Sequence, residues 1–499
     1  MSHGLGRLRW GAAFEGLLAA VAGLALDWAI GAAHPSLPFA PLALADRIVR
    51  LAPGALETFA IERLQHAALP LLGAGMTVCF LALGSALGFA FASSRVRAAA
   101  CAGLGFGAAL AGAELAAPLT PAIAAALASS SAAGALYAAV LLRLRRGPWR
   151  AGVDPGRRRV LLRLGAGTAT LLLGGTALGR LVASSTRAPV KGLRQPAVPP
   201  RRPFPRIDGL SPEVTPVASH YVVDIDLNDP SLDTGDWRLT VEGLVERKLR
   251  LDFEQLQRRF PLVGEYSVLT CISNRVGGPL VGNSLWHGVQ LRELLAAAGR
   301  RSRAREVVFE CADGYSAAIP VEHAMQPSVL VAIAQNGRSL TREHGFPCRL
   351  RAPAFYGIKN PKWIERIVLT DERFEGYWQR QGWTDSAVVR TESRIDSPSA
   401  AAAGEPTWIS GVAWAGLRGI AAVEVSTDGG RSWRIARLQR PLSPKAWTRW
   451  AYRWRPPRPG GNQLTCRAVD GHGQLQDSTR RPPHPTGASG YHQRTLEVA

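Results

Sequence analysis

The stretch Leu269-Thr270-Cys271-Ile272-Ser273-Asn274-Arg275-Val276-Gly277-Gly278-Pro279 joins a strand-like run to a polar, glycine-rich loop. A thiol at the end of a strand is well placed to meet a ligand, and consecutive glycines let the backbone come close to that ligand. Basic neighbours such as Arg275 would favour the thiolate. Taken alone, however, the stretch also fits a buried core cysteine, so its surroundings must decide between the two interpretations.

The composition outside this stretch indicates two different halves. The chain has 499 residues, 47% apolar and 19% charged, with a net charge of +21. These values are compatible if apolar and charged residues occupy different segments. Residues 11–185 are indeed rich in Ala, Leu and Gly, and the remainder has the composition of a water-soluble protein. The length allows roughly three domains of about 150 residues each.

The N-terminal part, residues 1–185, contains five apolar segments long enough to span a bilayer, which requires about 20 residues. They are approximately 11–33, 67–93, 98–117, 120–142 and 160–183. Several are rich in small residues, and Gly103 with Gly107 forms a GxxxG spacing that lets helices approach closely. The alternative is a water-soluble, alanine-rich bundle, which would normally show a polar face. We therefore predict a helical membrane domain of about five spans.

The distribution of arginines predicts how these spans are oriented. Basic residues gather in the N-terminal tail, in the loop with Arg95 and Arg97, and in the region 143–159. With five spans, all three regions lie on one side, which should be the cytoplasm. We therefore expect a multi-pass protein of the inner membrane, with its C-terminal half on the periplasmic or extracellular side. A nucleic-acid partner is not expected, because the densest basic run lies between two apolar segments.

Arg157-Arg158-Arg159 precedes the last apolar segment and resembles a twin-arginine export signal placed inside the chain. An ordinary basic loop has the same composition, so both interpretations stay open. Export of a folded domain would suit a protein whose cofactor is inserted in the cytoplasm.

Residues 186–217 are rich in proline and basic residues and predict an extended tether. Residues 218–400 alternate between strand-like and helix-like patterns, which indicates an α+β domain. We expect strands at Tyr221–Asp226, Trp237–Gly243, Glu306–Cys311 and Arg349–Ala352, and short helices at Leu251–Arg259 and Leu291–Ala298.

Residues 405–499 show only strand patterns. Ala421–Ser426 alternates, Asp428-Gly429-Gly430 predicts a hairpin turn, and Trp433–Leu438 is the expected partner strand. Leu464–Val469 is a later strand. Short strands with regular turns favour an Ig-like β-sandwich. The six cysteines show no CxxC or zinc-type spacing, so we expect no disulfide framework.

Six motifs in chain order resemble the sulfite oxidase superfamily of molybdopterin enzymes, over nearly all of residues 218–499. The β-sandwich resembles the dimerisation domain of that family through Val423-Glu424-Val425-Ser426-Thr427-Asp428-Gly429-Gly430 and Trp433. The six motifs are Trp237-Arg238-Leu239 with Val241 and Gly243; Thr270-Cys271-Ile272-Ser273-Asn274; Leu285-Trp286-His287-Gly288-Val289; Asp313-Gly314-Tyr315 with Ile319-Pro320; His344-Gly345-Phe346-Pro347; and Tyr356-Gly357-Ile358-Lys359-Asn360-Pro361-Lys362-Trp363.

The resemblance implies a molybdenum–molybdopterin cofactor with Cys271 as the protein's thiolate ligand, beside two sulfurs from the pterin. It places Tyr315 beside the substrate, where a phenol could donate a hydrogen bond to an oxyanion. A packed turn tyrosine remains the alternative for Tyr315. The residues implied to contact the cofactor are Tyr221, Val222, Asn274, His344, Arg349, Asn360, Pro361 and Lys362.

One departure from the family pattern concerns the substrate. Sulfite oxidases carry two adjacent arginines after the Asn of the cysteine loop, whereas Val276 follows Arg275 in this chain. Sulfite oxidation and sulfoxide reduction therefore both remain open. No cytochrome b5 domain is recognisable, so an external electron partner such as a cytochrome or a quinone-linked protein is implied. The resemblance also implies a homodimer. The alternative function is a degenerate, cofactor-free scaffold that relays signals to the membrane domain.

Overall fold

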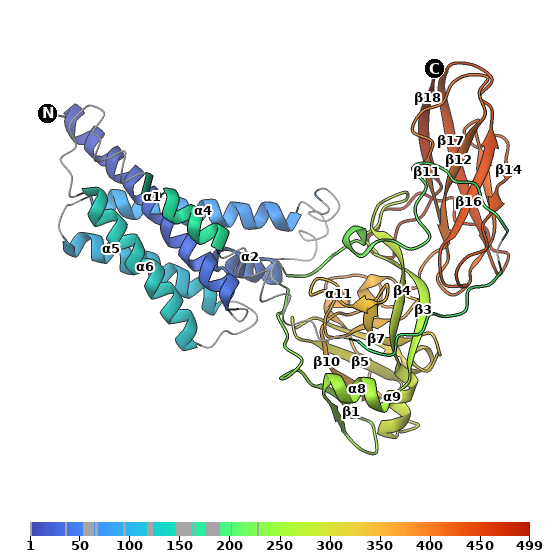
Figure 1. Cartoon of the computed structure of the whole chain (residues 1–499), viewed down its shortest axis with the longest axis horizontal. Coiled ribbons are helices and arrows are strands. Elements are labelled where there is room, and N and C mark those ends of the chain that lie inside the picture. The colour runs from blue at the N-terminus through green and yellow to red at the C-terminus, as the bar shows by residue number, and fades with distance from the viewer. Residues whose placement is uncertain are drawn as a thin grey trace. The chain divides into compact units, whose positions relative to one another are not determined.

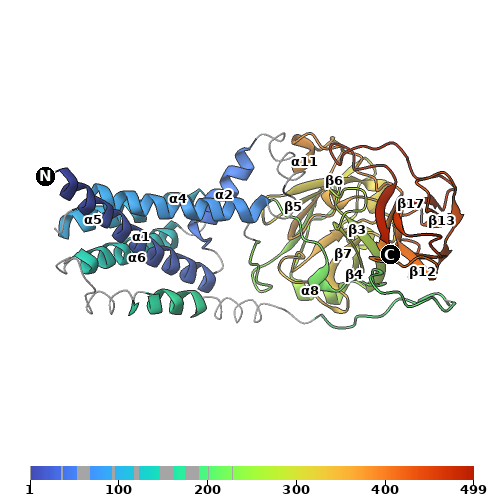
Figure 2. The same ribbon diagram turned by 90° about the horizontal axis from the view of Figure 1, so that it is seen from above.

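The computed structural model describes residues 2–34, 37–52, 64, 68–92, 96–116, 123–145, 162–163, 165–174, 190–200, 202–226 and 229–499. The chain divides into two compact units. One comprises Met1–Arg187 with Asp224–Ser231, and the other comprises Ala188–Val223 with Leu232–Ala499. Figures 1 and 2 show both units in two views.

The first unit is a bundle of apolar helices. Among the described residues, four helices are long and apolar enough to cross a membrane, and they pack around a core that contains Phe106, Tyr137 and Leu141. The predicted fifth span, 160–183, and the twin-arginine motif lie partly or wholly outside the described residues, which show there a shorter apolar helix, Gly165–Gly174. The bundle helices are α1 (Ser2–Ala33), α4 (Ala68–Ala90), α5 (Val96–Leu115) and α6 (Ile123–Arg145).

Glycines set the close packing of this bundle. A Cβ atom placed on Gly103 would lie 2.6 Å from the Gly134 carbonyl oxygen, and one on Gly107 would lie 2.9 Å from the Ser130 carbonyl oxygen. Helices α5 and α6 therefore meet along the predicted GxxxG face. Gly16 of α1 meets Gly84 of α4 in the same way, with 2.4 Å between the added Cβ and the carbonyl oxygen.

One buried ion pair crosses the bundle. Arg145 of α6 lies 3.2 Å from Glu15 of α1 and donates to the carbonyls of Gly88 and Phe91, so one guanidinium joins three helices.

A further helix, α2 (Ala40–Leu51), was not predicted. It is short and amphipathic, so it lacks the run of about 20 apolar residues that marks a membrane span.

The α+β part of the second unit contains two sheets. The first has the strand order β2-β1-β10-β5-β6, and the second has the order β3-β4-β7-β8 with β9 paired to β7. The strands are β1 (Leu239–Gly243), β2 (Leu249–Leu251), β3 (Leu262–Thr270), β4 (Val281–Gln290), β5 (Glu306–Cys311), β6 (Ser316–Pro320), β7 (Leu330–Gln335), β8 (Arg338–Ser339), β9 (Arg349–Arg351) and β10 (Ile364–Thr370).

Short helices connect these strands at the predicted places. The helix α8 (Phe253–Arg259) begins at Asp252, whose side chain accepts from the Gln255 amide in a capping box. The helix α9 (Leu291–Ala298) ends at Gly299, which adopts a left-handed φ of 71°. Two single turns, α10 (Val321–Ala324) and α11 (Tyr377–Arg380), complete this part.

The C-terminal residues form two four-stranded antiparallel sheets with a shared core that includes Val423, Trp450 and Cys466 (Figure 1). The predicted β-sandwich is therefore present. The sheet orders are β11-β12-β16-β15 and β14-β13-β17-β18. Their strands are β11 (Glu392–Ser397), β12 (Thr407–Trp414), β13 (Ile420–Ser426), β14 (Arg434–Ile435), β15 (Arg437–Leu438), β16 (Thr448–Trp454), β17 (Gly460–Asp470) and β18 (His492–Val498).

Two strand predictions were wrong. Tyr221–Asp226 is not a strand, because among the described residues no strand forms a hydrogen-bonded ladder with it; nor does its burial alternate, since Ile225 and Asp226 are both buried. The expected strand Trp433–Leu438 is two short strands, since Arg434–Ile435 pairs with β13 and Arg437–Leu438 pairs with β16 of the other sheet.

The segment predicted as a tether also differs from expectation. Its described residues carry no regular strand or long helix, but they pack against the second unit. The Arg194 carbonyl contacts the His287 ring at 3.2 Å, and the Thr215 amide donates to Asn283 at 2.7 Å. This segment is therefore part of the folded unit for much of its length.

Candidate functional site

Cys271 lies directly after β3, as the sequence predicted. Its side chain is buried, and its sulfur lies 2.9 Å from the Ser273 hydroxyl. Burial raises the pKa of the Cys271 thiol above its usual value. Hydrogen bonds from Ser273 and from the Ile272 backbone oppose this shift, and Arg275 is exposed, so its effect on the thiolate stays a prediction.

The loop after Cys271 is held by both domains of the second unit. Gly277 has a φ of 76°, and a Cβ atom there would lie 2.2 Å from the His492 ring of β18. Arg394 of β11 donates to the Gly278 carbonyl at 2.9 Å. Ile272 belongs to a buried cluster that also contains Val412 of β12. The β-sandwich therefore fixes the shape of the cysteine loop, and only glycine fits at position 277.

The residues expected to contact the cofactor lie in one region. Arg349 donates to the carbonyls of His344 and Asn360, at 3.1 and 3.2 Å. A Cβ atom on Gly345 would contact both Lys362 and Arg349, at 2.9 and 3.2 Å. The turn at Gly345 therefore lies against Arg349 of β9. Pro361 accepts from the Leu350 amide. The five predicted contacts from residues 344–362 thus gather around the start of β9.

Tyr221 connects this region to the cysteine. A Cβ atom placed on Gly357 would lie 3.1 Å from the Tyr221 hydroxyl and 3.7 Å from the Cys271 Cα. The Tyr221 ring stacks on His220 with centroids 5.3 Å apart, and His220 in turn meets the edge of His344 at 5.5 Å. Val222 follows in the same extended segment and is half-buried.

Both histidines of this cluster are neutral near pH 7. Burial, followed by the effect of His344, lowers the pKa of His220 to about 3. Burial, followed by the effect of Arg349, lowers the pKa of His344 to about 4. Each ring can therefore accept as well as donate a hydrogen bond. The positive charge of the region comes from arginine side chains instead.

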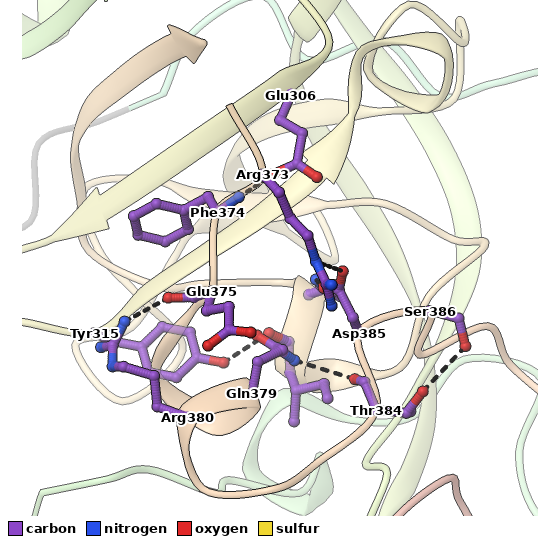
Figure 3. A network of polar contacts seen from close by, with 12 residues as sticks. Glu306, Tyr315, Arg373, Phe374, Glu375, Gln379, Arg380, Thr384, Asp385 and Ser386 are labelled. Carbon is purple, nitrogen blue, oxygen red and sulfur yellow. Dashed lines mark hydrogen bonds and ion pairs between the residues drawn. The ribbon is translucent and has the colours of Figure 1, made fainter. Parts of the chain in front are cut away.

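Tyr315 lies in the turn between β5 and β6. Its hydroxyl donates to the Ile358 carbonyl at 2.6 Å, and burial raises its pKa well above the usual value. Figure 3 shows this bond and the polar contacts of the neighbouring segment, Arg373 to Ser386. The Tyr377 ring of that segment lies 5.9 Å from the Tyr315 ring. Tyr315 stays a predicted substrate contact, and its observed hydrogen bond fixes the Ile358 backbone.

The two lysines of the last motif differ in environment. Lys359 is buried and forms an ion pair with Asp385 at 2.7 Å. Lys362 donates to the Glu343 carbonyl at 2.8 Å, and its ammonium lies over the Trp363 ring. The Lys359 ammonium is thus engaged by a carboxylate, and Lys362 stays the predicted cofactor contact.

Buried polar atoms test whether the site fits an anionic pterin with a sulfur-bound metal. Within the described part of the chain, the buried polar atoms of this site that lack a hydrogen-bond partner include His220 Nε2, Tyr221 Oη and Asn274 Nδ2. Buried polar atoms are normally satisfied, so a group of them marks a place for a polar ligand. No group of three or more His, Cys, Asp or Glu side chains among the described residues could hold a metal ion. Cys271 as a single protein ligand therefore requires a cofactor that brings its own donors, and the residues present fit one.

Sequence motifs did not single out two members of this region as site residues, His220 and Arg351. His220 precedes the matched segment by one position. Arg351 follows Arg349 by two residues, so both face the same side of β9. The period of a strand would have indicated Arg351.

Comparisons with known proteins agree with this geometry. The model of the oxidoreductase molybdopterin-binding domain matches residues 226–378, and the model of the Mo-co oxidoreductase dimerisation domain matches residues 379–480. Sulfite oxidase of Gallus gallus is 30% identical over 303 residues, which cover 51% of this chain and 66% of that protein. Human mitochondrial sulfite oxidase is 32% identical over 306 residues, covering 51% and 55%.

Two further relatives are, by their names, a nitrate reductase and a sulfane dehydrogenase. NADH nitrate reductase of Solanum lycopersicum is 29% identical over 289 residues, covering 46% of this chain and 32% of that protein. The crystal structure of the sulfane dehydrogenase SoxCD from Paracoccus pantotrophus is similar with a TM-score of 0.51 and 26% identity, covering 64% of this chain and 92% of that chain. The chain spans between about one third and two thirds of the length of the curated relatives named here. The chain therefore belongs to the sulfite oxidase superfamily of molybdopterin-dependent oxidoreductases, with molybdenum–molybdopterin as its cofactor.

Proposed function

We propose that this chain is a membrane-anchored oxidoreductase that transfers an oxygen atom to or from a small sulfur-containing substrate. Sulfoxide reduction and sulfite oxidation are the two candidate directions. The observation that carries the proposal is the buried thiol of Cys271, beside buried polar atoms of Tyr221 and Asn274 that have no partner among the described residues. When bound, the molybdenum centre would supply the oxygen-atom transfer and the change of oxidation state.

The protein's own residues would bind and orient that centre. Cys271 would give one sulfur ligand from the end of a rigid strand. Arg349 and Lys362 would attract the anionic part of the pterin, because guanidinium and ammonium groups suit phosphate. Asn360 and His344 lie against Arg349 and would keep it oriented.

The cysteine loop supports a substrate with little negative charge. Val276 occupies the position of the second arginine of sulfite oxidases, and the Arg275 side chain is exposed. The named relatives act, by their names, on sulfite, nitrate or sulfane sulfur. An uncharged sulfoxide needs one cation fewer than sulfite, and we therefore place sulfoxide reduction ahead of sulfite oxidation.

We further propose that the redox domain lies on the periplasmic or extracellular side of the inner membrane. The arginine bias of the N-terminal half supports this orientation. The match to a dimerisation domain over residues 379–480 supports a homodimer. Electrons would be exchanged with an external partner such as a cytochrome or a quinone-linked protein, which would act as donor in sulfoxide reduction and as acceptor in sulfite oxidation. Reporter fusions at the two chain ends test the orientation, and a cytoplasmic C-terminus would contradict it.

The decisive experiment measures molybdenum content and turnover of the purified full chain with sulfite and with sulfoxides. Cys271→Ala should lose both molybdenum-dependent turnover and the Cys-ligated spectroscopic signature of the metal. Cys466→Ala is the matched control, because Cys466 is equally buried but belongs to the sandwich core. Full activity of the Cys271→Ala protein would refute the proposal. A wild-type protein without molybdenum would favour the cofactor-free scaffold.

A further inference from the structure

Arg351 is a buried cation that the predicted site does not include. It is the last residue of β9 and only 1% exposed, compared with 5% for Arg349. Both guanidinium groups lie over the Trp286 ring, at 5.1 and 5.3 Å from its centroid. Two positive charges therefore share one aromatic platform inside the protein.

Hydrogen bonds of Arg351 join the cysteine strand to the cofactor loop. Its Nη2 donates to the Ser267 hydroxyl at 3.1 Å and to the Val268 carbonyl at 2.9 Å, and Val268 lies three residues before Cys271. Its Nη1 donates to Asn360 Oδ1. Asn360 is thereby fixed, and its own carbonyl accepts from Arg349.

The charge of Arg351 has no acidic counterpart nearby. In the described ranges no carboxylate lies within ion-pair distance of its guanidinium, and its Nε has no hydrogen-bond partner. Glu265, the acidic group that acts on it at longer range, is engaged by Lys445 at 2.8 Å. Burying a charge without an opposite charge is costly, which means that a bound anion would relieve the cost.

Neutral aromatic groups complete the surroundings. His220 meets the edge of the Trp286 ring at 5.8 Å, and its Nε2 is buried without a partner among the residues described. Because both histidines are neutral near pH 7, neither supplies nor cancels charge. The positive charge at the Trp286 ring therefore comes from the two arginines of β9.

We propose that Arg351 is a second cation of the anion site for the pterin's phosphate, acting as a positioning residue through Asn360 and through its uncompensated charge. This inference rests on the assignment of the cofactor to the site. The inference goes beyond that assignment, because it adds Arg351, on the same strand as Arg349, to the cations that attract the phosphate. Removal of Arg351 should then weaken anion binding even while Arg349 remains.

The test uses the full chain in detergent, produced in a host that cannot make the cofactor, with inorganic phosphate as the probe. Thermal unfolding is followed in phosphate and in chloride at equal ionic strength, and apparent phosphate affinity is obtained from the shift. Arg351→Met should reduce that affinity about tenfold or more, since bonds to charged groups are strong. Arg351→Lys should restore most of it.

Arg366→Met is the matched control, because Arg366 lies on β10, is half exposed and pairs with Glu242 and Glu310. It should leave the phosphate affinity unchanged. Arg351→Gln is the second variant: it keeps hydrogen-bonding capacity without charge and is used if the Met variant fails to fold. Phosphate affinity equal to wild type in either neutral variant would overturn the proposal, as would a wild-type protein that phosphate stabilises no more than chloride does.

The phosphate affinities of these variants test Arg351 independently of the proposed activity. A protein whose anion site behaves as expected but whose cofactor-loaded form turns over neither sulfite nor sulfoxides would leave Arg351 assigned and refute the proposed substrate class. Conversely, normal turnover with unaltered phosphate affinity in Arg351→Met would refute only the role of Arg351.

Discussion

Replacement of Glu392 by glutamine should raise the free energy of unfolding relative to the wild-type protein, and the difference should grow as the pH rises. Glu392 is buried on β11, and the Tyr356 hydroxyl donates to its Oε1 at 3.2 Å. Burial raises its pKa from 4.5 to about 8, with smaller opposing effects from Tyr356 and two arginines. The carboxyl group is therefore protonated in the folded protein at neutral pH, whereas it is ionised in the unfolded chain.

The sign and size of this pH dependence follow from the difference between the folded and unfolded pKa values of Glu392. A carboxyl whose folded pKa lies above its unfolded value contributes stability that is fully present below pH 4.5 and is lost as the pH rises through about 8. Each pH unit between these values corresponds to about 1.4 kcal/mol, so the whole range corresponds to at most about 5 kcal/mol. A glutamine can still accept the Tyr356 hydrogen bond, but it does not titrate.

The assay is thermal or denaturant unfolding of the full chain in detergent, followed by tryptophan fluorescence between pH 5 and pH 9. The stability of Glu392→Gln relative to wild type should increase steadily across this range and level off above about pH 8. Glu497→Gln, which removes an exposed carboxylate of the same sandwich, is the control and should show no such trend. A stability difference that stays constant with pH would refute the reasoning.

Two further substitutions test the neighbourhood of Cys271. Gly277→Ala should destabilise the protein by about 1–3 kcal/mol, because the backbone is left-handed and the new methyl group would collide with His492; its unfolding midpoint should fall, and an unchanged midpoint would contradict the described loop. Tyr315→Phe should cost about 1 kcal/mol through the lost bond to Ile358, measured by the same unfolding assay. If Tyr315 also contacts the substrate, turnover should fall while molybdenum content stays constant; equal turnover would reduce Tyr315 to a packing residue.

Much of the fold could be predicted because local patterns coincide with tertiary structure. The helix Leu291–Ala298 and the strand Glu306–Cys311 begin and end where the sequence placed them. The strand predicted at Tyr221–Asp226 is not formed, because an alternation of residue types does not by itself supply the partner that a strand requires. Trp433–Leu438 failed for a related reason, since a continuous pattern does not show that its two ends join different sheets.

The sequence by itself determined that Cys271 directly follows a strand, that a glycine-rich loop comes next, and that the chain resembles molybdopterin enzymes. These properties depend on local order along the chain and on residue types. Only the tertiary structure decided that the thiol is buried and that His492, 215 positions after Gly277, closes against its loop. It also decided that Arg351 joins Arg349 on the Trp286 ring. Such facts depend on contacts between distant segments, and no local pattern encodes the distance between two side chains that meet only when the sheets pack.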